Sequence, residues 1–169
     1  MSAAAGLWRA GVVTVSDRSS RGERPDTSGP LLASLLRELG LSVGEPVVVP
    51  DEVDAVQEAV RAAACSYDLV VTTGGTGLSP RDVTPEATRP LLDREVPGIA
   101  EALRQRGAAA VPTAVLSRGV AGTIGATLVV NLPGSTGGVR DGVAVLAPVL
   151  EHALAQLRGG GDHGVEAGA

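Results

Sequence analysis

The chain has 169 residues, of which 44% are hydrophobic and 20% are charged, and it carries a net charge of −5 at pH 7. A chain of this length and composition forms one globular domain with a real hydrophobic core. Its only aromatic residues are Trp8 and Tyr67, and its charge repels a polyanion, so we expect no nucleic-acid partner.

One cysteine, Cys65, excludes an internal disulfide and a cysteine-based metal cluster. It stands near the end of an alanine-rich helical pattern, which predicts a core cysteine. The first residues lack the basic start and apolar stretch of a signal peptide, and no apolar run approaches the ~20 residues of a membrane helix. We therefore expect a cytoplasmic protein without a membrane partner, with one domain over residues 1–158 and a flexible glycine-rich tail over 159–169.

The first predicted strand covers Ala10–Val15, where small and β-branched residues alternate. Polar residues follow at its carboxyl end, where ligands of open α/β sheets collect: Ser16, Asp17 and Arg18. A loop then leads to a predicted helix that Thr27 and Ser28 cap. The leucines of this helix share one face up to the stop at Gly40.

A second strand is predicted over residues 42–49, where Pro50 stops it, and Asp51 follows. The ordinary role of Asp51 is the N-cap of a helix over residues 52–64, because an aspartate there accepts a hydrogen bond from the first turn. A catalytic or magnesium-binding role is the alternative. The pattern alone leaves both roles open.

The stretch from Leu69 to Glu86 is the most informative part of the sequence. A buried strand is predicted over residues 69–72, and three glycines follow within four residues: Gly74, Gly75 and Gly77. Glycines after a strand let backbone N–H groups turn around an anion, although a tight turn is the plain alternative.

A cation and a carboxylate, Arg81 and Asp82, come directly after this glycine loop. Thr84 and Pro85 then open a helix, as N-cap and first helical residue. A strand, a glycine loop, a cation–carboxylate pair and a helix start in this order suit a phosphate ester with a magnesium ion.

The second half of the chain contains two predicted helices, over residues 85–94 and 97–106. A short strand is predicted over 113–116, a flexible turn over 119–125 and a strand over 127–131. A second glycine loop follows that strand, and Ser135 within it can cap a last helix over 139–157. His152 and His163 have no second metal ligand at a usable spacing.

Strands alternate with helices along the chain, so the predicted fold class is α/β. We expect a three-layer sandwich in which helices flank a mostly parallel central sheet. The strands over 113–116 and 127–131 are too close in sequence for a crossover helix. They are expected to be antiparallel, which makes the sheet mixed.

The two glycine loops and several carboxylates all stand at predicted strand ends. If those ends are neighbours, they form one crevice in which the loops hold phosphates, and Asp51 or Asp82 holds magnesium directly or through water. Candidate charge partners for the phosphates are Arg18, Arg81 and Arg118. A solvated surface arginine is the simple alternative for each of them.

The string TTGGTG followed by RDVTPEAT resembles the signature of the molybdopterin adenylyltransferase family, the MogA-type proteins. The resemblance runs from about Val12 to Leu157 through VVTVSDR, DTSG, VPDE, LSR and NLPGS. DTSG and GVAGTIG are closer to the MoaB-type branch, whereas the intact RDVTPE favours the MogA-type branch. The resemblance implies a compact α/β domain, commonly trimeric, that joins the phosphate of molybdopterin to AMP from ATP and releases pyrophosphate.

The resemblance also implies that Asp51 and Asp82 are essential, and we expect them to be the catalytic residues. The same two carboxylates are the candidate ligands of Mg2+. Together with the strand ends, the resemblance gives a set of candidate residues for binding molybdopterin and ATP: Ser16, Asp17, Thr73, Gly74, Gly75, Thr76, Gly77, Arg81, Ser117, Arg118, Pro133, Gly134 and Ser135. Two alternatives stay open, a molybdopterin carrier without chemistry and a molybdate-insertion activity. The molybdate-inserting enzyme is a candidate partner.

Overall fold

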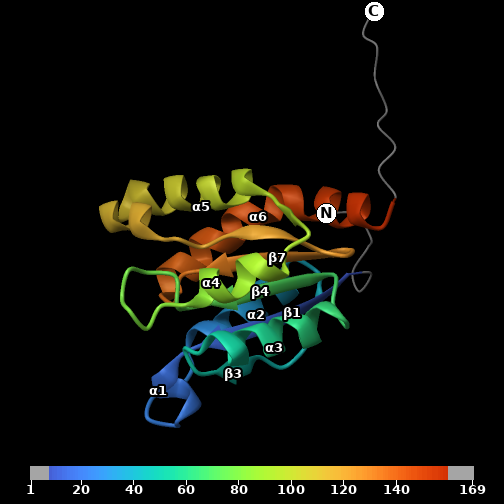
Figure 1. Ribbon diagram of the computed structural model, residues 1–169. Coiled ribbons are helices and arrows are strands. Elements are labelled where there is room, and N and C mark those ends of the chain that lie inside the picture. Colours follow the sequence, from blue (N-terminus) through green and yellow to red (C-terminus); the bar gives the residue numbers. More distant parts are fainter. Residues whose placement is uncertain (1–7, 160–169) are drawn as a thin grey trace, which may run out of the picture.

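A seven-stranded sheet runs through the centre of the computed structural model, which describes residues 8–159 (Figure 1). Its strands follow the order β2-β1-β4-β7-β6-β5, and β3 also pairs with β1. Their bounds are β1 (Arg9–Val15), β2 (Ser42–Val43), β3 (Val47–Val49), β4 (Leu69–Thr73), β5 (Arg94–Glu95), β6 (Ala121–Ile124) and β7 (Thr127–Leu132).

The pairing in this sheet is mixed. Strands β2, β3 and β4 pair in parallel with β1, and β7 pairs in parallel with β4. Strand β6 is antiparallel to β7, and β5 is antiparallel to β6. The predicted fold class, a mostly parallel but mixed sheet flanked by helices, is confirmed.

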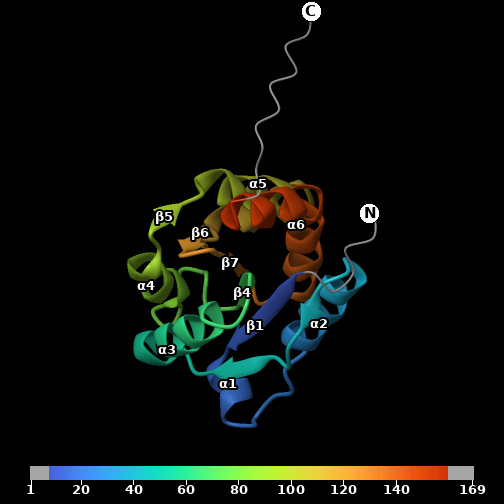
Figure 2. The same cartoon turned by 90° about the vertical axis from the view of Figure 1, so that its right-hand side faces the viewer.

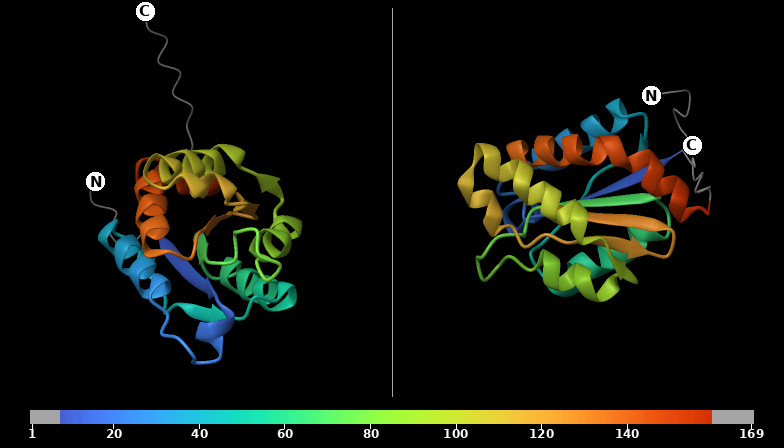
Figure 3. Two further views of the ribbon diagram at one scale, coloured as in Figure 1. Left: turned by 90° about the vertical axis from the view of Figure 1, so that its left-hand side faces the viewer. Right: turned by 90° about the horizontal axis from the view of Figure 1, so that it is seen from above.

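Helices cover both faces of the sheet, as the end-on view in Figure 2 shows. α2, α5 and α6 lie on one face and α3 and α4 on the other, whereas the short α1 lies at the end of the sheet (Figures 2 and 3). Their bounds are α1 (Asp17–Ser20), α2 (Ser28–Glu38), α3 (Val53–Ala64), α4 (Thr84–Thr88), α5 (Pro97–Ala110) and α6 (Thr136–Leu157), with 3-10 helices η1 (Arg89–Leu91) and η2 (Pro112–Leu116). None of the helices within residues 8–159 is long and apolar enough to cross a bilayer.

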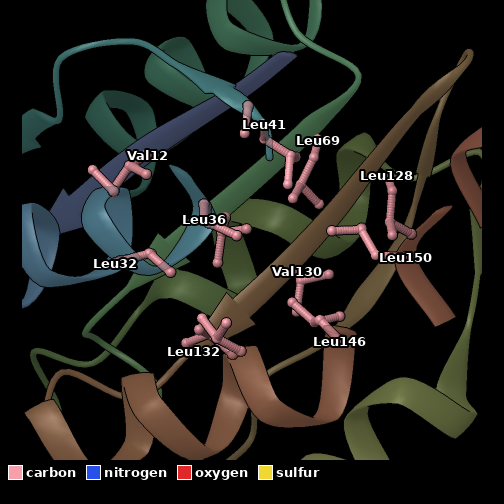
Figure 4. Packing of buried hydrophobic residues seen from close by; sticks show 14 of the residues in the cluster. Val12, Leu32, Leu36, Leu41, Leu69, Leu128, Val130, Leu132, Leu146 and Leu150 are labelled. Carbon is pink, nitrogen blue, oxygen red and sulfur yellow. The ribbon is translucent and has the colours of Figure 1, made fainter. Parts of the chain in front are cut away.

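Two hydrophobic clusters hold these layers together. The larger lies between the sheet and α2 and α6, where Leu32 and Leu36 of α2 and Leu146 of α6 pack against side chains such as Val130 and Leu132 (Figure 4). The smaller joins the other face of β1, β4 and β7 to α3 and α4 through valines and Ala87. Because helices cover both faces of the sheet, side chains on both faces of the central strands are buried. This explains why these strands are nearly continuous runs of apolar residues.

Strand β4 is the centre of the sheet, and all five of its residues are buried. It leads to α4 on one face, whereas its neighbours β1 and β7 lead to α2 and α6 on the other. The connections therefore diverge on both sides of β4. A crevice opens at the carboxyl ends of strands at such a point.

Two predictions for the second half of the chain are wrong. Residues 113–116 belong to the 3-10 helix η2, which begins at Pro112 and packs on α5 rather than in the sheet. The predicted turn over 119–125 contains strand β6, because its small residues pair with β7 across the hairpin turn at Gly125. The antiparallel pair is therefore β6 and β7.

Two further predictions fail for reasons of tertiary packing. The helix predicted over 85–94 is broken into α4, η1 and strand β5, which pairs with β6. Cys65 is exposed rather than buried. The buried stripe of α3 runs through Val56 and Val60, and Cys65 lies beyond the helix end and off this stripe. Of the predicted tail, only Gly159 lies within the described residues.

The start of α2 is held by Asp26 rather than by Thr27. The Asp26 carboxylate accepts hydrogen bonds from the Gly29 N–H (3.0 Å) and from the Thr14 hydroxyl of β1 (2.8 Å). Thr27 is exposed and its side chain makes no capping bond. Asp26 therefore ties the first turn of the helix to the sheet.

We expect Asp26→Ala to lower the free energy of unfolding by about 1–2 kcal/mol, the usual cost of losing a cap. Thr27→Ala is the matched control at the neighbouring position and should unfold within ~0.5 kcal/mol of the parent, as surface changes do. Urea denaturation of the three proteins measures both effects. Equal losses in the two variants would contradict the role of Asp26.

Candidate functional site

The loops after β1, β3, β4 and β7 meet at one edge of the sheet, because these four strands are parallel neighbours. The loop after β4 projects from this edge, and α1 lies at the same end (Figure 1). The two glycine loops and Asp82 line one cavity at this edge, whereas Asp51 lies beside the first loop without lining the cavity.

The first glycine loop turns immediately after β4. Gly74 and Gly75 have φ angles of +99° and +69°, a region that favours glycine. A Cβ at Gly74 would lie 2.3 Å from the carbonyl oxygen of Val15, and a Cβ at Gly75 would lie 2.3 Å from the hydroxyl of Thr84. Both positions therefore require glycine for conformation and for space.

The two glycine loops are bonded to each other. The Gly74 N–H donates to the Leu132 carbonyl (3.0 Å), and the Thr73 hydroxyl donates to the Pro133 carbonyl (2.8 Å). A Cβ at Gly134 would lie only 3.3 Å from the Cα of Gly74. The ends of β4 and β7 thus form one continuous wall.

The first loop presents unused donors. The backbone N–H groups of Gly75, Thr76 and Gly77 donate to no acceptor within residues 8–159. In the second loop, the Ser135 hydroxyl accepts the Gly138 N–H (3.0 Å), which confirms the predicted cap of the last helix, α6. Consecutive N–H groups in a turn and a long helix N-terminus both attract anions.

A cavity of about 570 Å³ lies beside these loops, a volume typical of small-molecule sites. Its polar wall includes many of the predicted residues: Gly74, Gly75, Thr76, Gly77, Asp82, Ser117, Pro133, Gly134 and Ser135. Its apolar wall comes from α5 and η2, through residues such as Leu103, Gly107 and Ala114. The cavity therefore suits a ligand with an anionic end and a flat or apolar body.

The two predicted carboxylates flank the first glycine loop. If Gly75 carried a Cβ, this atom would lie 3.2 Å from Oδ1 of Asp51. A Cβ added to Gly77 would lie 2.7 Å from Oδ2 of Asp82. Asp82 Oδ2 also accepts the Ser79 N–H (3.1 Å). Asp51 does not line the cavity itself and reaches the loop from the β3 side.

The predicted capping roles of Asp51 and Thr84 are wrong. Asp51 makes no bond to the first turn of α3, and its Oδ2 accepts the N–H of Asp17 instead (2.8 Å). The hydroxyl of Thr84 donates to the Gly74 carbonyl (2.9 Å), which fixes the glycine loop rather than the helix start. Both side chains serve contacts between loops that are distant in sequence.

Asp17 and Arg81 form an ion pair next to Asp51. The Nη2 and Nε of Arg81 lie 2.7 and 2.9 Å from Asp17 Oδ2. The hydrogen bond from Arg81 lowers the pKa of Asp17, whereas burial, with the like charges of Asp17 and Asp82, raises the pKa of Asp51.

Ser16 precedes this cluster, and its hydroxyl caps α1 by accepting the Ser19 N–H. Arg18 is exposed on the same helix.

Arg118 supports the first loop from behind. Its Nε donates to the Gly77 carbonyl and its Nη2 to the Asp82 carbonyl, both at 2.9 Å, and it pairs with Glu86. Ser117 lines the cavity, and its hydroxyl accepts the Gly119 N–H (3.3 Å). The guanidinium of Arg118 is therefore engaged by the protein's own backbone.

Several residues of the cavity wall were not among the predicted set, and Arg104 and Asn131 are two of them. Arg104 of α5 donates to the carbonyls of Ser117 and Gly119 (3.3 and 3.2 Å). Asn131 is buried at the end of β7, where it accepts the Val120 N–H and donates to the hydroxyl of Thr72. A polar amide in a strand of aliphatic residues was the available signal for Asn131. Arg104 resembles any other helix arginine in sequence.

Magnesium fits this site only with help from a phosphate. No group of three His, Cys, Asp or Glu side chains within residues 8–159 could hold a metal by itself. The Oδ1 atoms of Asp51 and Asp82 accept no hydrogen bond from the described protein groups, so each carboxylate keeps one oxygen for a cation. One or two carboxylates plus substrate phosphates is the usual protein environment of Mg2+.

The fold and the site define a class of protein: an open α/β domain with a cavity lined by two glycine loops at the carboxyl ends of its central strands. The family model described as "Probable molybdopterin binding domain" matches residues 11–152. The chain belongs to this family.

Proteins of known structure and name support this membership. A molybdopterin biosynthesis protein from Mycobacterium abscessus is 54% identical, with a TM-score of 0.86 over 90% of this chain and 98% of that one. A MogA structure is 50% identical, with a TM-score of 0.85 over 88% and 99% of the two chains. The molybdopterin adenylyltransferase of Pyrococcus furiosus is 37% identical over 89% of this chain and 92% of its own length.

Several curated relatives are much longer than this chain. It spans 22% of the gephyrin of Dictyostelium discoideum, at 40% identity over 87% of this chain. It spans 52% of a molybdenum cofactor biosynthesis bifunctional protein of Synechococcus elongatus, at 43% identity over 98% of this chain. The match therefore covers only part of the length of these relatives.

The raised pKa of Asp51 gives a prediction for stability. The protonated carboxyl stabilises the folded state below the unfolded pKa, and this contribution is lost as the pH rises through the folded pKa. Asp51→Asn keeps an acceptor for the Asp17 N–H but carries no charge. We therefore expect Asp51→Asn to gain stability relative to the parent as the pH rises: the free energy of unfolding of the variant minus that of the parent should be larger at pH 7 than at pH 4.

Urea denaturation at the two pH values measures this difference. Glu58→Gln, an exposed change on the adjacent helix α3, is the control and should show no comparable dependence on pH. A relative stability of Asp51→Asn that falls between pH 4 and pH 7 would contradict the assigned direction of the pKa shift.

Proposed function

We propose that this protein adenylylates molybdopterin with ATP and releases pyrophosphate in the biosynthesis of the molybdenum cofactor. One observation carries the proposal most directly: three unused backbone N–H groups, flanked by Asp51 and Asp82, stand beside a cavity of about 570 Å³. The names of relatives matched along nearly their full lengths agree with it.

In this reaction a phosphate oxygen of molybdopterin forms a bond with the α-phosphorus of ATP. The bond from that phosphorus to the bridging oxygen of the β-phosphate breaks, and pyrophosphate leaves with the electron pair. The attacking phosphate is already ionised at neutral pH, so the site needs no strong general base. Alignment and charge neutralisation then supply the catalysis.

The residues of the crevice have distinct tasks in this proposal. The N–H groups of the first glycine loop and the N-terminus of α6 bind phosphate oxygens, and the wall of α5 and η2 excludes water from the ligand. Ser117 and Ser135 line the same cavity and can donate to a ligand. Donors fixed before the substrate arrives need no reorganisation when charge develops.

Asp51 and Asp82 would hold Mg2+ together with substrate phosphates. The ion would supply positive charge at the phosphates of the nucleotide. The protein contributes the fixed positions of the two carboxylates, which are set by hydrogen bonds from the N–H groups of Asp17 and Ser79.

One mixture tests the proposal: the protein with molybdopterin, ATP and MgCl2. We expect adenylylated molybdopterin, detected by mass, and one pyrophosphate released for each product molecule. A carrier without chemistry would bind the pterin and release no pyrophosphate. A molybdate-inserting activity would depend on added molybdate. Either of these results would replace the proposed activity.

We expect Asp51→Asn and Asp82→Asn to lower turnover by about a hundredfold or more, roughly 3 kcal/mol of barrier, as is typical for losing one catalytic electrostatic contact. Asparagine keeps the oxygen that accepts the Asp17 or Ser79 N–H, so both variants should fold. Pyrophosphate release and thermal melting are measured on the same preparations, with Glu58→Gln as control. Parental turnover in either variant would remove that aspartate from the mechanism.

We further propose a cytoplasmic homotrimer whose product passes to a molybdate-inserting enzyme. Exposed apolar side chains on η2 and beside it, at Val111, Val115 and Leu116, support self-association, and Val111 and Leu116 also line the cavity. Two relatives that this chain half covers are named bifunctional, which supports a link to a further step. Exposed apolar residues close together mark association surfaces.

Sedimentation equilibrium at micromolar concentration tests the assembly. The expected mass is about three times the 16.9 kDa of the chain. Val115→Asp puts a charge on the exposed face of η2 and should lower the mass, whereas Val149→Asp on α6, also exposed, is the control. A monomeric parent protein would contradict the trimer.

A further inference from the structure

Asp17 is the point at which three loops of the crevice meet. It lies in α1 after β1, and its carboxylate bonds to Asp51 after β3 and to Arg81 after β4. Its Oδ1 accepts the Asp51 N–H (3.0 Å), and its Oδ2 accepts both contacts from Arg81 (2.9 and 2.7 Å). Both oxygens are therefore occupied by the protein's own groups.

The pairing of Asp17 with Asp51 is reciprocal. Each carboxylate accepts the backbone N–H of the other residue, at 2.8 and 3.0 Å, so the two residues close a ring of two hydrogen bonds. The Asp17 N–H is the single hydrogen-bond donor to the Asp51 carboxylate within residues 8–159. This ring fixes Asp51 with Oδ2 toward Asp17 and leaves Oδ1 near Gly75.

The contact with Arg81 reaches the other carboxylate. Arg81 directly precedes Asp82 in the exposed part of the first glycine loop. Arg118 holds the same loop from the opposite side, at the carbonyls of Gly77 and Asp82. The ion pair with Asp17 thus joins the loop that carries Asp82 to the loop that carries Asp51. Arg81 also neutralises the charge of Asp17 beside Asp51.

We propose that Asp17 is a positioning residue, which orients Asp51 through the reciprocal hydrogen bonds and holds Asp82 in place through Arg81. This inference rests on the proposed adenylyl transfer, because it assigns Asp17 a role in that reaction without contact to a substrate. Partners that orient a ligand-binding carboxylate typically contribute about 10–100-fold to affinity or activity.

The chain offers a closely matched control in Asp68, which lies at the opposite end of the sheet. Its carboxylate also accepts one backbone N–H, from Arg9 (2.8 Å), and one arginine contact, from Arg158 (2.8 Å). The side chains of Asp17 and Asp68 are 17% and 19% exposed. Asp17→Asn therefore removes an aspartate–arginine ion pair at the crevice, and Asp68→Asn removes the same kind of ion pair at the opposite end of the sheet.

The first measurement separates the steady-state constants for pyrophosphate release. Asp17→Asn removes the ion pair with Arg81, whereas the backbone N–H of Asp17 and an amide oxygen can keep the two hydrogen bonds with Asp51. We expect this variant to lower kcat about tenfold or more, with the KM for ATP within about threefold of the parent, as loss of a contact that orients the site does. Asp68→Asn should keep kcat within about twofold. Equal kcat values in the two variants, or an effect of Asp17→Asn confined to KM, would overturn the positioning role.

The second measurement does not depend on activity. Trypsin cleaves after arginine, and Arg81 stands in an exposed loop. We expect Asp17→Asn to speed cleavage after Arg81 severalfold, because the loop opens more often without its ion pair, and Asp68→Asn to leave this rate unchanged. Fragments are identified by mass. Unchanged cleavage in Asp17→Asn would overturn the link from Asp17 to the Asp82 segment.

Arg81→Gln provides a second approach if Asp17→Asn fails to fold. It removes the ion pair and leaves the ring of hydrogen bonds with Asp51 intact. A kcat loss in Arg81→Gln supports the role, and parental kcat contradicts it. If Asp17→Asn does fold, the kcat losses of the two variants should not be additive in the double variant. A parent protein that releases no pyrophosphate would refute the proposed function, and the trypsin rates would still decide whether Asp17 holds the loop.

Discussion

The close approach of Gly74 to β1 is the constraint on which the crevice depends. The Gly74 N–H bonds to the end of β7, and its Cα faces the Val15 carbonyl so closely that no side chain could fit between them. A glycine here lets three parallel strands end together, with the chain turning away from both neighbours. As a result, the first glycine loop, with its unused N–H groups, and the second glycine loop line the same cavity.

Around that turn, the polar side chains of the crevice hold one another more than they project into it. Thr73, Thr84 and Arg118 donate to loop carbonyls, and Asp17 is shared between Asp51 and Arg81. Among the described residues, the groups that stay free include the backbone donors of the first glycine loop, one oxygen on each of two carboxylates and the O–H groups of Ser117 and Ser135. Such an arrangement is rigid before a ligand binds, which is the condition for electrostatic stabilisation of a transition state.

Much of this could be predicted from sequence, because apolar strands such as Leu69–Thr73 and glycine loops are local patterns. Predictions failed where a distant partner decides the structure. β6 looks like a turn until β7 pairs with it, and Asp51 looks like a helix cap until Asp17, 34 residues earlier, supplies its hydrogen bond. A single sequence carries no signal for such contacts.

The bonds that assemble the crevice join residues far apart along the chain: 60 residues separate Thr73 from Pro133, and 64 separate Asp17 from Arg81. A structure with such a high contact order folds slowly, because chain entropy is lost before distant contacts form. The crevice cannot exist in a partly folded chain in which only local helices have formed. Ligand binding at this crevice would therefore report completed folding of the whole parallel sheet.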